Sequence, residues 1–223
     1  MKLRASDPRE YLRADEIVDG SHPEVAALAK RLRREHANDV SFAAAAFGFV
    51  RDSIQHSWDA QDRRVTLSAT EVLRERVGLC YSKTHLLAAV LRAEGVPAGL
   101  CYQRLSDDGE RFALHGLVAI HLHGSWHRLD PRGNKPGIDA QFSLDTERLA
   151  WQARPEHGER DYPDVFIAPH PTVLAAFTDA RDMLALCSAG LPSELPETSS
   201  PEPQPLEPLT VRRDTLPAKF LPE

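Results

Sequence analysis

The stretch VGLCYSKTH, residues 77–85, places a cysteine where a helix is expected to begin. Small and apolar residues recur from Cys80 at helical spacing until Gly95 and Pro97 end the pattern. Cys80 is therefore predicted in the first turn of a helix, where free backbone N–H groups and the helix dipole favour a thiolate. Gly78 is predicted to let the chain turn sharply and to let a substrate come close.

A β-hairpin is predicted after this helix. Its strands are expected at residues 113–122 and 125–130, joined by a tight turn at His123-Gly124. With a loop of two or four residues, His115 and Asp130 lie on one face as diagonal neighbours, roughly 7 to 8 Å apart at the backbone. A three-residue loop would place them on opposite faces, so the turn length decides whether they meet.

A cysteine, a histidine and an acid in one site are typical of nucleophilic acyl transfer. Cys80 would attack a carbonyl carbon, His115 would pair with the thiolate and later protonate the leaving group, and Asp130 would orient the imidazole. The backbone N–H of Cys80 is the first candidate to bind the oxyanion. Trp58 and Gln55, both upstream, are the candidates for a second donor.

Four features follow one another along the chain: GLC at 78–80, LRAEGVPA at 91–98, His115 on a strand, and WHRLDP at 126–131. With these features the sequence resembles the transglutaminase-like superfamily of papain-type cysteine enzymes, as a bacterial-type single-domain member. The resemblance covers about residues 45–135. The resemblance implies that Cys80, His115 and Asp130 form a catalytic triad. It also implies an α+β fold, with N-terminal helices and the nucleophile helix packed on an antiparallel sheet.

Three further helices are expected before Cys80. One begins at a capping box, Ser21 to Glu24, and ends near His36. A second is predicted from Ser41 to about His56, and a third begins at the capping box Ser68 to Glu71. These helices are expected to pack around the nucleophile helix.

The rest of the chain predicts a sheet, one more helix and a tail. Strands are expected at residues 98–105 and 137–142, and residues 154–163 are expected to be a loop. Residues 171–187 are predicted to form the last helix. The expected domain is therefore residues 1–190, with a core at about 41–142, and residues 191–223 are predicted to be a flexible, proline-rich tail.

Composition and charge restrict the class of protein. The chain has 223 residues, 42% of them hydrophobic, and a net charge of −6, so we expect a soluble protein that does not bind nucleic acid. The sequence has neither an apolar run of about 20 residues nor a signal-peptide core, so no membrane partner is expected. Three widely spaced cysteines indicate reduced thiols and a cytoplasmic location.

Several other residues have alternative interpretations. Tyr81 could line the cleft or belong to the core, and Cys101 and Cys187 are expected to pack as small hydrophobic residues. A zinc site at His121 and its neighbours His123 and His127 is a rival hypothesis, although no further ligand is placed to complete it. The sequence has no phosphate-binding glycine loop and no calcium loop, so no cofactor is expected.

The sequence therefore predicts a cysteine enzyme that acts on an amide or peptide substrate, which could be a protein, through a thioester at Cys80. Hydrolysis, as by a protease or amidase, is slightly favoured over transfer to an amine, because an open thioester meets water by default. The alternative from another class is a catalytically inactive transglutaminase-like domain that serves as a binding module. Selective alkylation of Cys80 would distinguish the two.

Overall fold

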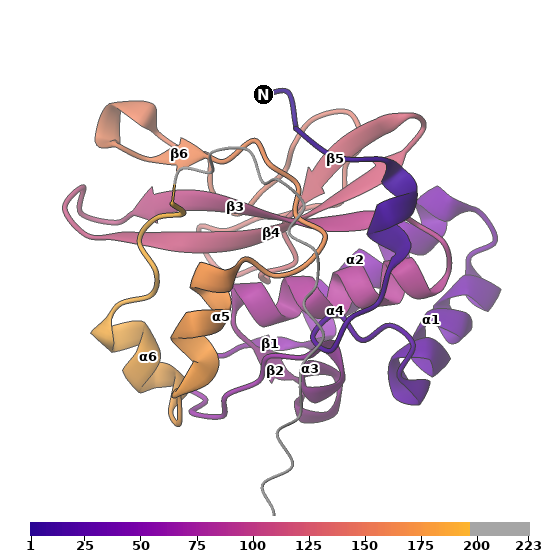
Figure 1. The fold of residues 1–223 in the computed structure, drawn as a ribbon, viewed down its shortest axis with the longest axis horizontal. Coiled ribbons are helices and arrows are strands. Elements are labelled where there is room, and N and C mark those ends of the chain that lie inside the picture. Colours follow the sequence, from indigo (N-terminus) through magenta and orange to yellow (C-terminus); the bar gives the residue numbers. More distant parts are fainter. Residues whose placement is uncertain (197–223) are drawn as a thin grey trace, which may run out of the picture.

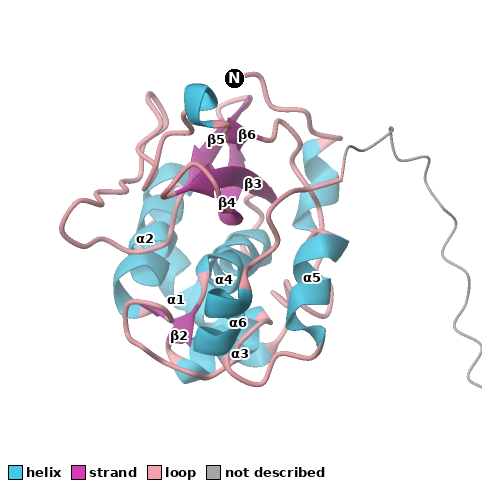
Figure 2. Cartoon of the chain, turned by 90° about the vertical axis from the view of Figure 1, so that its left-hand side faces the viewer, coloured by secondary structure: helices cyan, strands magenta, loops and turns pink. Residues whose placement is uncertain are grey.

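The chain forms two layers, an antiparallel sheet and a group of helices, in a computed structural model that describes residues 1–196 (Figure 1). The helices are η1 (Pro8–Leu12, 3-10), α1 (Pro23–Glu35), α2 (Asp39–Ser53), α3 (Ala69–Glu75), α4 (Cys80–Ala93), η2 (Pro155–His157, 3-10), α5 (Pro171–Thr178) and α6 (Met183–Ala189). Figure 2 shows the sheet above and the helices beneath it. The predicted α+β class is confirmed.

Two sheets are present in the described residues. The strands are β1 (Gln55–His56), β2 (Val77–Gly78), β3 (Ala98–Ser106), β4 (Phe112–Leu122), β5 (Ser125–Leu129) and β6 (Arg160–Asp161). The larger sheet has the order β5-β4-β3-β6, with every pair antiparallel. The two-residue strands β1 and β2 pair in parallel and bring residue 56 beside residue 78, two positions before Cys80.

The predicted helix starts are correct at one capping box and wrong at the other. Ser68 and Glu71 form the expected box at the start of α3, with each side chain bonded to the backbone of the other. Ser21 does not cap α1. Pro23 occupies the first helical position, which makes His22 the N-cap, and its Nδ1 accepts a hydrogen bond from a backbone N–H at 3.3 Å.

The second helix begins and ends earlier than predicted. It was expected from Ser41 to about His56, but Asn38 is its N-cap and its side chain accepts a hydrogen bond from the backbone N–H of Ser41 at 2.9 Å. The helix ends at Ser53 because the next residues leave it to form β1. The pairing of β1 with β2 supplies their backbone hydrogen bonds, which a sequence pattern cannot anticipate.

The edge of the large sheet also differs from the prediction. No strand forms at residues 137–142, where Lys135 and Ile138 make only an isolated bridge. The additional strand is β6, which lies within the segment expected to be a loop. It pairs with β3 over two residues, and the side-chain amide of Gln103 donates a hydrogen bond to Asp161 at 2.8 Å.

The main core lies between the sheet and the helices. Alternate residues of β3 and β4 point toward the helices, among them Leu100, Tyr102, Leu114, Val118 and Ile120. The intervening residues face a smaller cluster on the outer side, which contains Tyr11, Cys101, Leu117, Ala119, Leu149 and Val165. Helix α4 lies under the sheet, and every residue from Cys80 to Arg92 is buried.

The last part of the described chain returns to the body. The helix predicted over residues 171–187 is two helices, because Asp182 caps a new N-terminus through bonds from two backbone N–H groups. Residues 191–196, which the sequence assigns to the tail, pack against the body. The Pro192 carbonyl accepts a hydrogen bond from the backbone N–H of Leu114 at 2.7 Å, and Leu195 is buried. The remainder of the predicted tail, residues 197–223, lies outside the described residues.

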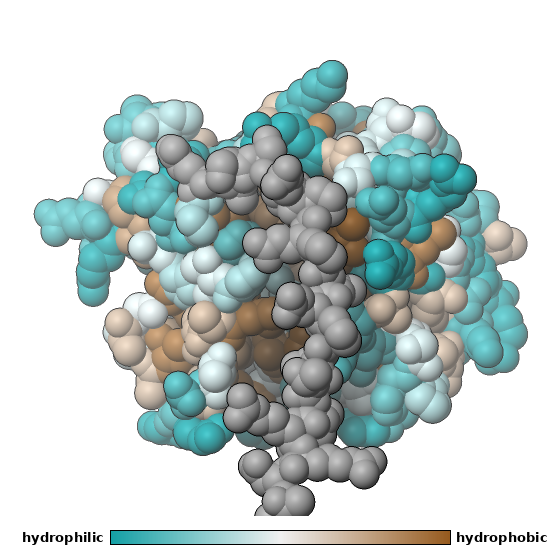
Figure 3. Space-filling model, viewed as in Figure 1, coloured by the Kyte–Doolittle hydropathy of each residue, from teal (hydrophilic) through white to brown (hydrophobic). Residues whose placement is uncertain are grey.

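The surface in Figure 3 is hydrophilic over much of its rim, and apolar residues gather on the lower half near α5 and α6. Some of the partly buried apolar residues there pack against the main core, including Ala176 and Leu186. None of the helices in residues 1–196 combines the length and the apolar character that a membrane crossing requires.

Gly116 of β4 is expected not to tolerate a side chain. An added Cβ would lie 3.0–3.3 Å from atoms of Tyr81, including its backbone N and Cα, so the first turn of α4 would have to move away from the strand. We expect Gly116→Ala to lower the free energy of unfolding by about 1–3 kcal/mol, measured by urea denaturation. The control is Gly48→Ala in α2, where no atom lies within 4 Å of the added Cβ. Equal stability of the two variants would contradict the close contact.

Candidate active site

Cys80 is the first residue of α4, and no side chain caps this end of the helix. Within residues 1–196 its backbone N–H donates to no other group, so it is free to bind an oxygen of a ligand. The residue is 5% exposed and lines a cleft of about 730 Å³. The start of α4 at Cys80 therefore borders this cleft.

Gly78 allows close packing and not the sharp turn that the sequence predicted. Its φ is not positive, so any residue could adopt its backbone conformation. A Cβ at this position would, however, lie 2.7 Å from Oγ of Ser82, which is in the first turn of α4. The missing side chain lets the start of the nucleophile helix pack directly against β2.

The hairpin has the two-residue turn that brings the predicted histidine and aspartate to one face. Leu122 pairs with Ser125, and the turn residues His123 and Gly124 have φ values of 51° and 76°, as a type I′ turn requires. His115 Nε2 and Asp130 Oδ2 are 2.8 Å apart. The meeting of these two side chains, predicted from the turn length, is confirmed.

Asp130 is held from several directions. It is fully buried, and its carboxylate accepts hydrogen bonds from the backbone N–H of Arg132 at 3.1 Å and of Ala150 at 3.0 Å. With the bond from His115, three N–H donors fix the two oxygens. The carboxylate therefore has one orientation, and it holds the imidazole in a corresponding one.

The charges of this pair follow from their contacts. Burial alone would lower the pKa of His115, but the Asp130 carboxylate and the nearby side chain of Cys80 outweigh it and raise the pKa to about 10. Burial alone would raise the pKa of Asp130, but His115 and the backbone donors outweigh it, and the pKa is lowered. An imidazolium and a carboxylate are thus favoured, and Cys80 lines the same cleft as His115.

Trp151 covers the imidazole and was missed by the sequence interpretation. Its ring meets His115 edge to face, with centroids 5.0 Å apart and planes at 89°, and it is 37% exposed in the cleft. The Arg132 guanidinium lies 5.2 Å from the indole centroid. The only local signal was a large aromatic residue in a polar, irregular segment, which does not indicate what it contacts.

The other predicted site residues lie in different places. Trp58 is 44% exposed and lines the cleft with Cys80, whereas Gln55 is exposed and lines a neighbouring cavity of about 370 Å³. Tyr81 is fully buried, and its hydroxyl donates to the Leu114 carbonyl, so it supports β4 from within the core. Of these three, only Trp58 can meet a ligand at Cys80.

His56 is a further cleft residue that the sequence did not single out. It lines both the cleft and the neighbouring cavity, and its Nδ1 is buried without a hydrogen-bond partner among residues 1–196, 4.0 Å from Asp59 Oδ2. Burial and the Arg132 guanidinium lower its pKa to about 3, so the imidazole is neutral. Its place depends on the pairing of β1 with β2, which no local pattern announces.

The two other cysteines differ from each other. Cys101 is fully buried in the outer core, as expected, and burial raises its pKa to about 12. Cys187 is half-buried and packs against the main core, as expected, and it also lines the cleft. Burial also raises the pKa of Cys187, to about 11.

The histidines of the hairpin have other partners than a metal. The His121 ring packs edge to face on Trp126, and His127 Nε2 bonds to the Leu122 carbonyl at 3.2 Å. Within residues 1–196 no three His, Cys, Asp or Glu side chains are grouped so as to hold a metal ion.

Comparison with known proteins gives a family for the part of the chain that carries these residues. Residues 26–131 match the family model of the transglutaminase-like superfamily, and this match includes Cys80, His115 and Asp130. The match begins within α1, earlier than the predicted core at about 41–142. No curated protein matches the sequence.

Two solved structures similar to this chain are both bacterial. One is a protein of Cytophaga hutchinsonii proposed to be a cysteine protease, with 19% identity, a TM-score of 0.48, and coverage of 57% of this chain and 42% of the other. The second is the periplasmic domain of TgpA from Pseudomonas aeruginosa, with 24% identity, a TM-score of 0.42, and coverage of 56% and 48%. The chain thus spans less than half the length of either structure.

Asp130→Asn is expected to lower the pKa of His115, because it removes the carboxylate that raises it. In the wild type, His115 stabilises the fold fully below about pH 6.5, the value of an unfolded histidine, and this stabilisation is lost as the pH rises through about 10. In Asp130→Asn, the contribution of His115 to stability should depend much less on pH. NMR titration of the imidazole and urea denaturation at several pH values would measure both effects.

The matched control is Asp139→Asn, which neutralises an exposed carboxylate that pairs with Arg148. This variant should leave the His115 titration unchanged. An unchanged His115 pKa in Asp130→Asn would show that the hydrogen bond between the two side chains does not hold the imidazole.

Proposed function

We propose that this protein is a cysteine-dependent acyl-transfer enzyme that acts on amide or peptide bonds through a thioester at Cys80. The observation that carries the proposal is the position of His115, which bonds to Asp130 at 2.8 Å and lines the same cleft as Cys80. Cys80 and His115 both line the cleft, and Asp130 is fully buried. The cytoplasmic location that the sequence predicts stays a prediction.

In the first step the Cys80 thiolate attacks the carbonyl carbon of the amide. A C–S bond forms, the carbonyl electrons move to oxygen, and His115 carries the proton. When the tetrahedral intermediate collapses, the C–N bond breaks and the imidazolium gives its proton to the leaving amine. Asp130 keeps the imidazole oriented with Nε2 bonded to it, which leaves Nδ1 to serve the sulfur and the leaving group.

In the second step an acceptor resolves the thioester. Water or an amine attacks the thioester carbon while neutral His115 takes its proton. A C–O or C–N bond forms, the C–S bond breaks, and the Cys80 thiolate leaves, so that water gives a carboxylic acid and an amine gives a new amide. The cleft is open to solvent along a rim that includes Trp58 and Trp151, both partly exposed. Hydrolysis is therefore favoured over transfer to an amine.

Cys80→Ala is expected to abolish thioester formation and alkylation by iodoacetamide at neutral pH. In the wild type, alkylation should be confined to Cys80, because burial raises the pKa of Cys101 to about 12 and of Cys187 to about 11, which leaves little thiolate at either. Mass spectrometry of alkylated peptides over a pH series would measure the selectivity. Cys187→Ala, the matched control in the same cleft, should keep the Cys80 rate.

The same experiment separates the enzyme from an inactive binding module. If Cys80 reacts no faster than Cys187 and His115→Ala does not change its rate, the enzyme proposal fails and the inactive module is favoured. Addition of a primary amine to the acylated enzyme then distinguishes the acceptors, because a new amide appears only if amines compete with water.

Trp58 is proposed as the second oxyanion donor, beside the backbone N–H of Cys80, because its indole lines the cleft and Gln55 does not. We expect Trp58→Phe to slow acylation of Cys80 by an activated ester by about 10²–10³-fold. Alkylation by iodoacetamide should not change, since it forms no oxyanion. Gln55→Ala is the control. Equal losses in acylation and alkylation would exclude this role for Trp58.

A further inference from the structure

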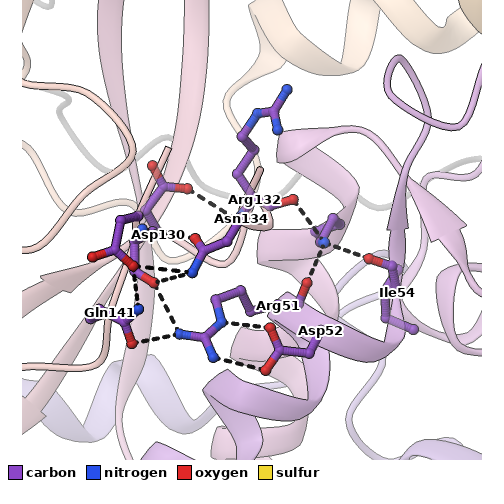
Figure 4. A network of polar contacts seen from close by, with 10 residues as sticks. Arg51, Asp52, Ile54, Asp130, Arg132, Asn134 and Gln141 are labelled. Carbon is purple, nitrogen blue, oxygen red and sulfur yellow. Dashed lines mark hydrogen bonds and ion pairs between the residues drawn. The ribbon is translucent and has the colours of Figure 1, made fainter. Parts of the chain in front are cut away.

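Lys83 lies in α4 one turn after Cys80 and is fully buried. Its ammonium forms no ion pair with a carboxylate in the described chain. It donates instead to three backbone carbonyls, those of Arg51 at 3.3 Å, Ile54 at 2.6 Å and Arg132 at 2.8 Å (Figure 4). A buried charge without a carboxylate partner is costly, so a structure retains it only where its hydrogen bonds matter.

Two of these carbonyls belong to the end of α2. The last carbonyls of a helix have no partner within the helix and carry the negative end of its dipole, so a cation is favoured there. The contacts with Arg51 and Ile54 thus fix the Lys83 side chain against α2. These two contacts would be sufficient if Lys83 served only to cap α2.

The third carbonyl connects Lys83 to the candidate triad. The Arg132 carbonyl oxygen accepts a hydrogen bond from the Lys83 ammonium. The backbone N–H of Arg132 donates a hydrogen bond to Asp130 Oδ1 at 3.1 Å. The next residue, Gly133, has a φ of 114°, and a Cβ there would lie 3.5 Å from the Lys83 nitrogen. Arg132 therefore links the loop that carries Asp130 to the ammonium, and Figure 4 shows Arg132 with Asp130 on one side and the nitrogen on the other.

We propose that Lys83 is a positioning residue, which holds the loop at residues 130–133 so that Asp130 is aligned with His115. Lys83 and Cys80 are on one rigid helix. The distance between Cys80 and the residue that holds the Asp130 loop is therefore fixed. Three residues of helix rise by about 4.5 Å. The inference concerns the geometry of the triad and rests on the proposed function only for its catalytic meaning.

The ammonium form suits this role. Three carbonyl acceptors match the three N–H donors of a charged lysine, whereas a neutral amine keeps only two. Burial and the Arg132 charge lower the pKa of Lys83 to about 7, and the carboxylates of Asp130, Asp52 and Asp59 act in the opposite direction. Loss of the proton would weaken one of the three contacts.

Arg92 offers a matched control within the same helix. It is also a buried cation that donates to three backbone carbonyls, those of Ala98, Arg13 and Ile167, at 2.6–2.8 Å. None of these carbonyls belongs to the loop that carries Asp130. Arg92→Met thus removes a comparable set of bonds without touching the site.

The test compares Lys83→Met with Arg92→Met by urea denaturation, by NMR titration of His115 and by the rate of Cys80 alkylation. Both variants should lose stability. Only Lys83→Met should lower the His115 pKa, by about one unit, which corresponds to a tenfold change in the equilibrium. Only Lys83→Met should slow the alkylation of Cys80 at neutral pH, by about tenfold.

A normal His115 titration in a folded Lys83→Met would overturn the proposal, because Lys83 would then only cap α2. If the methionine variant does not fold, Lys83→Gln, which keeps two N–H donors, is measured in its place, and the same outcomes decide. The NMR readout does not need an active enzyme. Failure of the proposed function, seen as unselective alkylation in the wild type, therefore remains distinct from failure of this inference.

Discussion

The burial of α4 on all sides is the constraint on which the rest of the structure depends. A polar side chain on a buried helix cannot reach water, so each one needs a partner in the surrounding elements. Lys83 and Arg92 each bind three backbone carbonyls, and His85 Nδ1 bonds to the Leu67 carbonyl at 2.8 Å. These hydrogen bonds fix the surrounding loops to α4, and Cys80 is the first residue of this helix.

The candidate site is assembled by close contacts between separate elements. Gly116 lets the first turn of α4 approach β4, and Gly78 lets it approach β2. His115, beside Gly116, lines the same cleft as Cys80, and the hairpin turn brings Asp130 to the imidazole. The pair is almost wholly buried, and this is why each partner strongly affects the charge of the other.

Residues outside the family match complete the site. The matched segment, 26–131, contains the candidate triad, but the backbone N–H of Ala150 bonds to Asp130 and the ring of Trp151 covers His115. Cys187 and Leu191 line the same cleft from the far end of the described chain. The superfamily segment thus provides the chemistry proposed here, and the following segments shape what can reach it.

The sequence by itself determined the helix start at Cys80, the turn at His123-Gly124 and hence the meeting of His115 with Asp130, because helix ends, turn types and strand alternation depend on neighbouring residues. It did not predict β6, the break before Asp182, or the return of residues 191–196 to the body. Those features, like the cover that Trp151 gives and the anchor at Lys83, depend on contacts between residues far apart in the chain. Only the tertiary structure decided them, since such contacts leave no periodic pattern.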